Sequence, residues 1–175
     1  MSHSPVKQPD IRPVREQDRS TIDGVIAAAF DGTDEVALVR KLAADSDIVL
    51  ELVAEMDGQI AGHILFSRLW VEQSGNRLAA VALAPLAVSA EMQRTGLGSA
   101  LVEAAHKLLV LQGEVLSIVL GDPAYYGRFG YSVADAAGLE SVYPAQYLQA
   151  KHLTDTATLA PLQGKLIYAS AFGEN

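Results

Sequence analysis

The segment from residue 78 to residue 120 constrains the fold most strongly. Residues 78–88 are apolar at nearly every position, which is typical of a strand covered on both faces. Residues 98–112 show the helical period, Gly113 follows as a C-terminal stop, and residues 115–120 form a second apolar run. A helix of about four turns between two strands is the crossover that makes neighbouring strands parallel. The sequence therefore predicts a strand-helix-strand unit with a parallel pair.

A β-hairpin precedes this unit. Residues 48–56 and 59–72 are rich in Val, Ile and Leu and flank Asp57-Gly58, the dipeptide most typical of a tight type I′ turn. These elements indicate an α/β (α+β) fold class with a mixed central sheet of about six to seven strands, and the family resemblance given below implies helices on both faces of that sheet. We also expect helices over residues 18–30 and 34–44, the first with Asp18 as its N-cap. Short strands are expected over residues 11–14, 131–133 and 165–169, and Pro13 places the first of these at a sheet edge.

Length and composition limit the number of domains. With 175 residues, 50% of them hydrophobic, the chain can bury a full core as a single domain over residues 1–175. Residues 1–10 are polar and aperiodic, so we expect a flexible tail there. The chain has no cysteine, which excludes disulfides and every mechanism with a cysteine nucleophile.

The charge balance bears on the partners of the protein. Asp and Glu number 21 against 13 Lys and Arg, which argues against a nucleic-acid partner, because phosphate backbones are bound by clustered cations. No apolar run reaches the roughly 18 residues that cross a bilayer, and the first residues lack the apolar core of a secretory signal. We therefore expect a cytoplasmic protein with no membrane partner.

The loop before the predicted helix has the composition of an anion site. Gly96 and Gly98 lie at the helix start, where backbone N–H groups have no intrahelical partner and glycine lets an anion approach closely. Two common phosphate motifs do not fit. A dinucleotide fingerprint needs a third small residue where Leu101 stands, and a P-loop needs a lysine where Ser99 stands.

The segment Gln93-Arg94-x-Gly96-x-Gly98 resembles the Gln/Arg-x-x-Gly-x-Gly/Ala signature of the GNAT superfamily of acyl-CoA-dependent N-acetyltransferases. In that family the backbone amides of the signature hold the pyrophosphate of CoA. Two glycines at a helix start also fit a simple turn, so the neighbouring segments matter. The resemblance implies cofactor contacts from Gln93, Arg94, Thr95, Gly96, Leu97, Gly98 and Ser99.

Pro85 interrupts the apolar strand before this signature. A proline removes a hydrogen-bond donor from a central strand, so we expect a bulge there, although a bend at the strand end is an alternative. In GNAT folds the corresponding strand is bulged and splays from the next parallel strand, and the pantetheine arm of CoA pairs with the freed backbone. The resemblance places those backbone contacts at Leu86, Ala87 and Val88, beside a splayed parallel strand pair.

A second match follows the second apolar strand. Gly121-Asp122-Pro123-Ala124-Tyr125-Tyr126-Gly127-Arg128-Phe129-Gly130-Tyr131 is similar to the Tyr-x-x-x-Gly-Phe ending of GNAT domains, and more specifically to a YhbS-like branch of predicted acetyltransferases. Tyr131 replaces the usual Phe and keeps an aromatic ring there. Tyr126 holds the family position of the catalytic tyrosine, which is protonated at neutral pH and can serve the departing CoA thiolate. Tyr125 is the second candidate, and a purely structural tyrosine is the alternative.

The resemblance implies transfer of an acetyl group from acetyl-CoA to a primary amine of a small molecule, peptide or protein. Without a cysteine for a covalent intermediate, we expect direct attack by the amine in a ternary complex. The strand before the signature offers no carboxylate, so the general base must come from elsewhere. The candidates are Asp31, Asp34, Glu35, His63, Glu72 or a water. For each of these residues, a solvated or helix-capping role is the more common one.

Other functions stay open at this point. A domain that keeps the CoA cleft without turnover would be a catalytically silent acyl-CoA-binding or regulatory module. An RNA- or peptide-directed acyltransferase would need a basic channel, which the overall charge does not suggest. The family resemblance also admits a homodimer. We expect no metal, because the four histidines are dispersed without a ligand motif: His3, His63, His106 and His152. We expect no serine hydrolase, because no Gly-x-Ser-x-Gly occurs.

Overall fold

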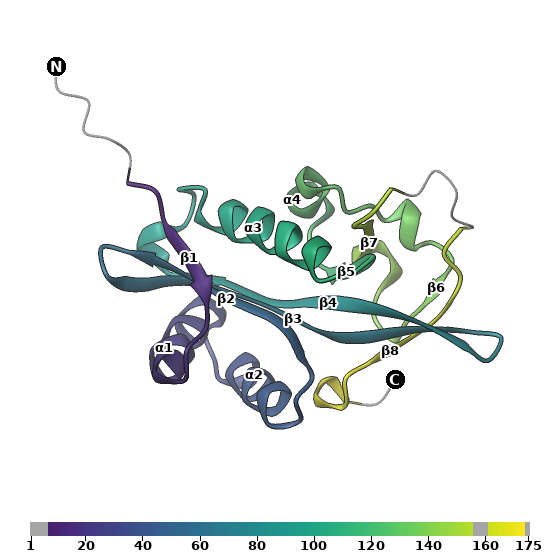
Figure 1. Ribbon diagram of the computed structural model, residues 1–175, viewed down its shortest axis with the longest axis horizontal. Coiled ribbons are helices and arrows are strands. Elements are labelled where there is room, and N and C mark those ends of the chain that lie inside the picture. Colours follow the sequence, from purple (N-terminus) through teal and green to yellow (C-terminus); the bar gives the residue numbers. More distant parts are fainter. Residues whose placement is uncertain (1–6, 156–160, 174–175) are drawn as a thin grey trace, which may run out of the picture.

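A mixed sheet of eight strands runs along the molecule (Figure 1). We describe it from a computed structural model, which describes residues 7–155 and 161–173. The main path of the sheet is β1-β2-β3-β4-β5-β7, and β8 pairs with both β3 and β6. The strands are β1 (Asp10–Pro13), β2 (Ile48–Met56), β3 (Gln59–Gln73), β4 (Asn76–Val88), β5 (Leu116–Leu120), β6 (Leu139–Glu140), β7 (Leu148–His152) and β8 (Gly164–Tyr168).

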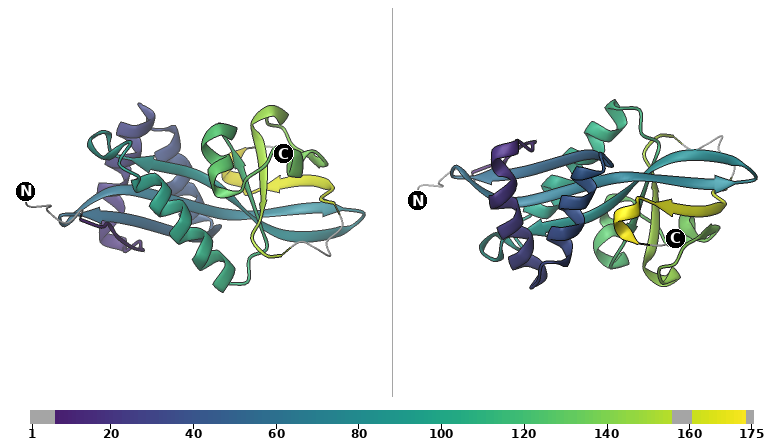
Figure 2. Two further views of the ribbon diagram at one scale, coloured as in Figure 1. Left: turned by 90° about the horizontal axis from the view of Figure 1, so that it is seen from above. Right: turned by 90° about the horizontal axis from the view of Figure 1, so that it is seen from below.

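Helices cover both faces of the sheet, as Figures 1 and 2 show. α1 (Arg19–Phe30) and α2 (Asp34–Ala44) pack on one face, while α3 (Leu97–Leu111) and α4 (Pro123–Tyr126) lie on the other. The chain after β5 covers the half of the sheet that α1, α2 and α3 leave free. Short 3-10 helices lie at Glu16–Asp18, Ala90–Met92, Gly127–Phe129, Ala134–Ala136, Ala145–Tyr147 and Ser170–Phe172.

The alternation of apolar side chains along the strands explains these layers. Leu52 and Val53 are both fully buried on β2 but point to opposite faces, as successive strand residues must. Leu52 packs with Phe66 and with Leu101 of α3. Val53 packs with Ile26 of α1 and its neighbours on the other face. Both faces of the central strands are therefore core, and the open surfaces lie at the strand ends.

The parallel pair and the hairpin predicted from the sequence are confirmed. Asp57 and Gly58 have φ angles of 53° and 78°, the positive values that a type I′ turn needs. β1 lies at the edge of the sheet, as Pro13 indicated. β4 and β5 run parallel through three residue pairs: Val81 with Ser117, Ala82 with Ile118 and Leu83 with Val119.

Other expectations need correction. The sheet has eight strands rather than six to seven, because the short strands β6, of two residues, and β7, of five residues, are not among the elements expected from the sequence. Residues 131–133 form no strand, and Ser132 makes only an isolated bridge to Ala150. Asp10 belongs to β1 and not to the expected tail, of which residues 1–6 lie outside the described residues. The first residues of β4 are exposed, so its two-sided burial begins only near Ala80.

Asp18 joins the edge strand to the first helix. It precedes α1 as expected, but its carboxylate does not cap that helix and instead accepts hydrogen bonds from Arg12 Nη1 at 2.7 Å and from the backbone N–H of Arg15 at 2.7 Å. Arg12 Nε also donates to Glu55 on β2, at 2.6 Å. The hydrogen bond from Arg12 is the main reason why the pKa of Asp18 falls to about 2. This cluster ties β1, α1 and β2 together.

Replacing Asp18 by Asn should lower the free energy of unfolding by about 2 kcal/mol, the typical worth of a hydrogen bond between charged groups. A carboxyl with a lowered pKa stabilises the fold above its unfolded-state pKa and loses that contribution as the pH falls toward about 2. Urea unfolding at neutral and acidic pH measures both effects. The control is Asp45→Asn, which removes an exposed pair with Lys41 and should cost less than about 0.5 kcal/mol. An equal loss of unfolding free energy in the two variants would contradict a stabilising role for the hydrogen bonds of Asp18.

Candidate active site

The parallel strands β4 and β5 separate before β4 ends. Their pairing stops at Leu83, but β4 continues to Val88, and over that stretch it pairs only with β3 among the described residues. The register against β3 shifts here, since Leu83 faces Phe66 while Leu86 faces Ile64. The bulge expected at Pro85 is confirmed, and the Ala84–Pro85 peptide bond is cis. The last residues of β4 therefore have one open edge.

The hydrogen-bond alternation of an antiparallel pair shows which groups reach that edge. Ser89 donates its backbone N–H to the carbonyl of Ala61 at 2.8 Å, so every second residue of β4 from there points its backbone toward β3. Ala87, paired with His63, is turned to β3 in this way. Leu86 and Val88 point their N–H and C=O groups to the open edge. Of the three backbone contacts expected from the sequence, the geometry therefore leaves two available.

The open edge of β4 leads to the loop before α3. Gly96 has a φ of 88° and Arg94 a φ of 63°, so the loop depends on left-handed backbone at two positions. Gln93 Nε2 donates to the carbonyl of Val88 at 3.2 Å, and the Thr95 hydroxyl donates to the carbonyl of Met92 at 2.5 Å. These bonds hold the loop across the end of β4.

A cavity of about 300 Å³ lies in front of this loop and the first turn of α3. The free N–H groups of a helix start and the arginines at its walls suit an anion. Six of the seven loop residues expected from the sequence line the cavity. Thr95 does not, and its hydroxyl is bonded within the loop. The lining residues are Val88, Met92, Gln93, Arg94, Gly96, Leu97, Gly98, Ser99, Tyr125 and Arg128.

Tyr125 and Tyr126 both belong to α4, but only Tyr125 lines this cavity. Asp122 caps this helix by accepting a hydrogen bond from the N–H of Ala124 at 2.9 Å. A Cβ on Gly98 would lie 2.7 Å from the Tyr125 hydroxyl, so only glycine allows the tyrosine to reach the start of α3. The Tyr126 ring packs on Gly121 at the end of β5, perpendicular to the Tyr125 ring at 4.9 Å between centroids.

Burial raises the pKa of Tyr126 to about 12, with a smaller contribution from Tyr125. The Tyr126 hydroxyl is therefore protonated throughout the physiological pH range. Its ring also contacts that of Tyr131, perpendicular at 5.8 Å. Tyr126 is thus a neutral hydrogen-bond donor held between the end of β5 and the core.

Tyr131 has a structural role that the sequence reasoning missed. Its hydroxyl lies 2.8 Å from Ser117 Oγ and 3.0 Å from His106 Nε2, in a buried network between β5, α3 and the Tyr126 ring. A phenylalanine at this position would leave Ser117 and His106 without this partner. Ser117 is a polar residue inside an otherwise apolar strand, and this feature of the sequence indicates a buried hydrogen-bond partner.

His63 is the base candidate that lies beside the open part of β4. It is fully buried, and its Nε2 lies 2.8 Å from Glu51 Oε1. Arg19 donates two further hydrogen bonds to the Glu51 carboxylate, at 2.6 and 2.7 Å. His63 Nδ1 has no hydrogen-bond partner among the described residues. Because His63 faces Ala87 across the β3-β4 ladder, its ring lies one strand away from the opening.

Glu51 is the residue that holds this histidine. Burial alone would raise the pKa of Glu51, but the hydrogen bonds from His63 and Arg19 outweigh it and hold the pKa below its ordinary value. Glu51 is therefore ionised and accepts a hydrogen bond from His63 Nε2–H, which orients the ring and leaves Nδ1 as the nitrogen without a partner among the described residues.

The other base candidates come from three different parts of the chain. Glu72 forms an exposed ion pair with Arg77 on the far part of the β3-β4 hairpin. Asp31 follows the last residue of α1 with a positive φ, while Asp34 and Glu35 occupy the first turn of α2. None of these four carboxylates lines the cavity at the start of α3.

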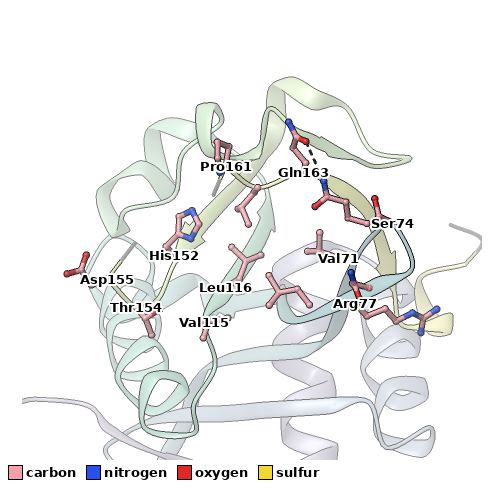
Figure 3. A pocket seen from close by; sticks show the side chains of 14 residues that line it. Val71, Ser74, Arg77, Val115, Leu116, His152, Thr154, Asp155, Pro161 and Gln163 are labelled. Carbon is pink, nitrogen blue, oxygen red and sulfur yellow. Dashed lines mark hydrogen bonds between the residues drawn. The ribbon is translucent and has the colours of Figure 1, made fainter. Parts of the chain in front are cut away.

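A larger cavity, of about 710 Å³, lies at the opposite end of β4 (Figure 3). Val71, Leu116 and His152 point into it, and Gln73 donates to Gln163 across its rim at 3.4 Å. None of the site residues expected from the sequence lines it. The sequence signature and this cavity therefore mark two different places on the molecule.

Comparison with known proteins decides the family. The profile of the acetyltransferase (GNAT) domain matches residues 10–134, which includes β4, the loop, α3 and both tyrosines. The chain belongs to the GNAT acetyltransferase family. This GNAT domain is 35% identical over 143 residues to the uncharacterized N-acetyltransferase YhbS of Escherichia coli (strain K12), covering 80% of the chain and 84% of YhbS. It is 36% identical over 134 residues to the uncharacterized YjhQ of the same strain, covering 75% and 72%.

Solved GNAT structures show the same fold. The crystal structure of YhbS from Escherichia coli in complex with CoA superposes with a TM-score of 0.89 at 32% identity, covering 99% of this chain and 97% of YhbS. A GNAT acetyltransferase from Brucella melitensis in complex with acetyl-CoA gives 0.77 at 30% identity, covering 94% and 98%. The fold class expected from the sequence, with its splayed parallel pair, is confirmed.

Within residues 7–155 and 161–173, no helix is both long and apolar enough to cross a membrane. The same residues contain no group of three or more His, Cys, Asp or Glu side chains placed to hold a metal ion.

Proposed function

We propose that the protein is an acetyl-CoA-dependent N-acetyltransferase that moves the acetyl group of the thioester to a primary amine by direct attack in a ternary complex. The open edge of β4 at Leu86 and Val88, which leads to the cavity at the start of α3, carries this proposal. CoA and acetyl-CoA occupy GNAT relatives of about one-third identity, which supports the same co-substrate here.

The cofactor would be held by backbone groups along most of its length. The two amides of the pantetheine arm would pair with the free N–H and C=O groups of Leu86 and with the N–H of Val88, as an added strand does. The Val88 carbonyl already accepts a hydrogen bond from Gln93. The pyrophosphate would lie at the N-terminus of α3, where Arg94 and Arg128 line the cavity. The arm and the pyrophosphate together would place the thioester in the opening between β4 and β5.

The chemistry then needs three groups. As the amine nitrogen bonds to the thioester carbon, a free N–H of β4 would stabilise the oxyanion, a contribution of about 3 kcal/mol. When the C–S bond breaks, the Tyr126 hydroxyl would donate a hydrogen bond to the CoA thiolate. The amine must also lose a proton. His63 Nδ1, which has no partner among the described residues, would accept that proton through a bridging water beside Ala87, across about 4.8 Å, the spacing of one strand.

Gly96→Asp should abolish CoA binding, because it adds a carboxylate at the proposed pyrophosphate site. The matched control is Gly113→Asp at the other end of α3. Gly113 has a φ of 87° and Gly96 a φ of 88°, so a side chain causes similar backbone strain at both positions. Neither glycine has another group within 4 Å of an added Cβ. Calorimetric titration with CoA measures the effect. Equal CoA affinity in the two variants would contradict the placement of the pyrophosphate at the start of α3.

Tyr126→Phe should lower kcat by about 10²-fold, with CoA affinity preserved, because it removes only the proposed donor to the thiolate. Tyr125→Phe should instead change CoA affinity, since its hydroxyl lies at the start of α3. Release of free CoA thiol from acetyl-CoA over an amine panel measures the rates. A larger loss of kcat in the Tyr125 variant would reverse the two roles. Saturable CoA binding without thiol release for any amine would favour a silent acyl-CoA-binding module.

His63→Gln should lower kcat/KM by about 10²-fold, because glutamine has no counterpart of Nδ1. Glutamine keeps an N–H donor for Glu51, so the fold and CoA binding should change little. Initial rates over a range of amine concentrations are the measurement, with calorimetric titration of CoA as the control for binding. An unchanged kcat/KM would show that His63 only supports the structure.

A further inference from the structure

The Lys and Arg side chains of this acidic chain fall into two groups, those that form ion pairs with carboxylates and those that do not. Within residues 7–155 and 161–173, which contain all 13 Lys and Arg side chains, seven form ion pairs with carboxylates within 4.0 Å. A paired cation contributes little to the field beyond its partner. The seven are Lys7, Arg12, Arg19, Arg40, Lys41, Arg68 and Arg77.

Four of the six cations without such a pair lie around α3 and α4. Arg94 and Arg128 line the cavity at the start of α3. Lys107 and Lys151 line a second cavity of about 680 Å³, and Arg128 lines that one too. The two cavities share Arg128 in their walls, and we call the surface that they form together along α3 the groove. A protein with a formal charge of −8 thus concentrates its unneutralised positive charge in this groove.

Arg128 is fixed at the junction without a carboxylate among the described residues. Its guanidinium stacks over the Tyr125 ring at 4.6 Å and lies 5.2 Å from the centre of the Phe129 ring. It makes long hydrogen bonds to the carbonyl of Tyr125, at 3.3 Å, and to Ser99 Oγ, at 3.5 Å. Aromatic stacking orients a guanidinium and leaves its charge available to an anion.

The second cavity combines positive charge with an apolar wall. Lys151 comes from β7 and Lys107 from the exposed side of α3, while Val110, Leu111 and Phe129 supply apolar surface. Leu111 is 82% exposed, an unusual state for a large apolar side chain beside two lysines. Glu103 is the carboxylate that lines this cavity, against three cations. Burial, with Lys151 nearby, lowers the pKa of His106 to about 4, so His106 is neutral and adds no charge.

We propose that Lys107, Lys151 and Arg128 form a second anion subsite that takes the 3′-phosphate of CoA, with the apolar wall of the same cavity against the adenine. The proposal rests on the proposed function, because it needs the pyrophosphate at the start of α3. Lys107 lies nine residues after Gly98, which is about 13 Å along the helix. The nucleotide end of CoA runs on from the pyrophosphate past Arg128, so its phosphate reaches the two lysines.

The test compares CoA with 3′-dephospho-CoA, which lacks this single phosphate. Calorimetric titration at fixed ionic strength should show that the wild-type protein binds CoA about tenfold tighter or more, since two or three charge-assisted contacts are lost with the phosphate. The double variant Lys107→Ala/Lys151→Ala should bind CoA within about twofold of dephospho-CoA, while its affinity for dephospho-CoA stays at the wild-type value. Arg128 is left in place because it also lines the pyrophosphate cavity.

Lys165→Ala is the matched control, because Lys165 is an exposed lysine without an ion pair among the described residues and lies on β8. The Lys165→Ala variant should keep the wild-type preference for CoA over 3′-dephospho-CoA. If the wild-type protein binds both ligands equally, or the double variant weakens both equally, the subsite is wrong while the pyrophosphate assignment stands. If the wild-type protein binds neither ligand, the proposed function fails and the subsite with it.

Discussion

The unsatisfied backbone at the end of β4 is the constraint on which the rest of the site depends. Strands in the middle of a sheet normally use both edges, and an N–H or C=O group left without a partner costs free energy unless water or a ligand supplies one. Here the bulge at Pro85 and the short pairing with β5 leave Leu86 and Val88 with one free edge each. A linear ligand with spaced amides is the complement of such an edge.

The two faces of the sheet serve this edge differently. On the α3 face, Leu86 and Val88 pack toward Gly98, so the free backbone and the start of the helix are held in one unit. On the α1 face, the same part of β4 lies next to a buried ionised group, since Glu51 holds His63 against Ala87. Cofactor binding and proton transfer can thus approach one opening from opposite sides without competing for the same side chains.

Much of this arrangement could be read from the sequence, for physical reasons that are local. Asp57-Gly58 fixes its turn by its own backbone preference, and the periodicity of α3 and the apolar run of β5 predict the parallel crossover. Pro85 predicted the bulge because a missing donor acts on its own strand. The glycines of the loop are likewise required by local backbone geometry and by the approach of Tyr125.

What the sequence could not supply depends on long-range pairing. The phase of the β3-β4 ladder decides that the backbone N–H and C=O groups of Ala87 point to β3 while those of Leu86 and Val88 point to the open edge, and no local pattern encodes that phase. Glu51 and His63 are twelve residues apart and meet only because β2 and β3 form a hairpin. The groove of unpaired cations joins residues from α3, β7 and the turn after α4, so charge counting along the chain concealed it.

Amide hydrogen exchange at the end of β4, followed residue by residue by NMR, tests the central claim most directly. In the free protein the amides of Leu86 and Val88 should exchange quickly and that of Ala87 slowly, because only Ala87 is bonded to β3. Saturating CoA should slow exchange at Leu86 and Val88 and leave Ala87 unchanged. If all three amides are already protected without CoA, or if CoA changes neither Leu86 nor Val88, then the cofactor does not bind as an added strand on this edge.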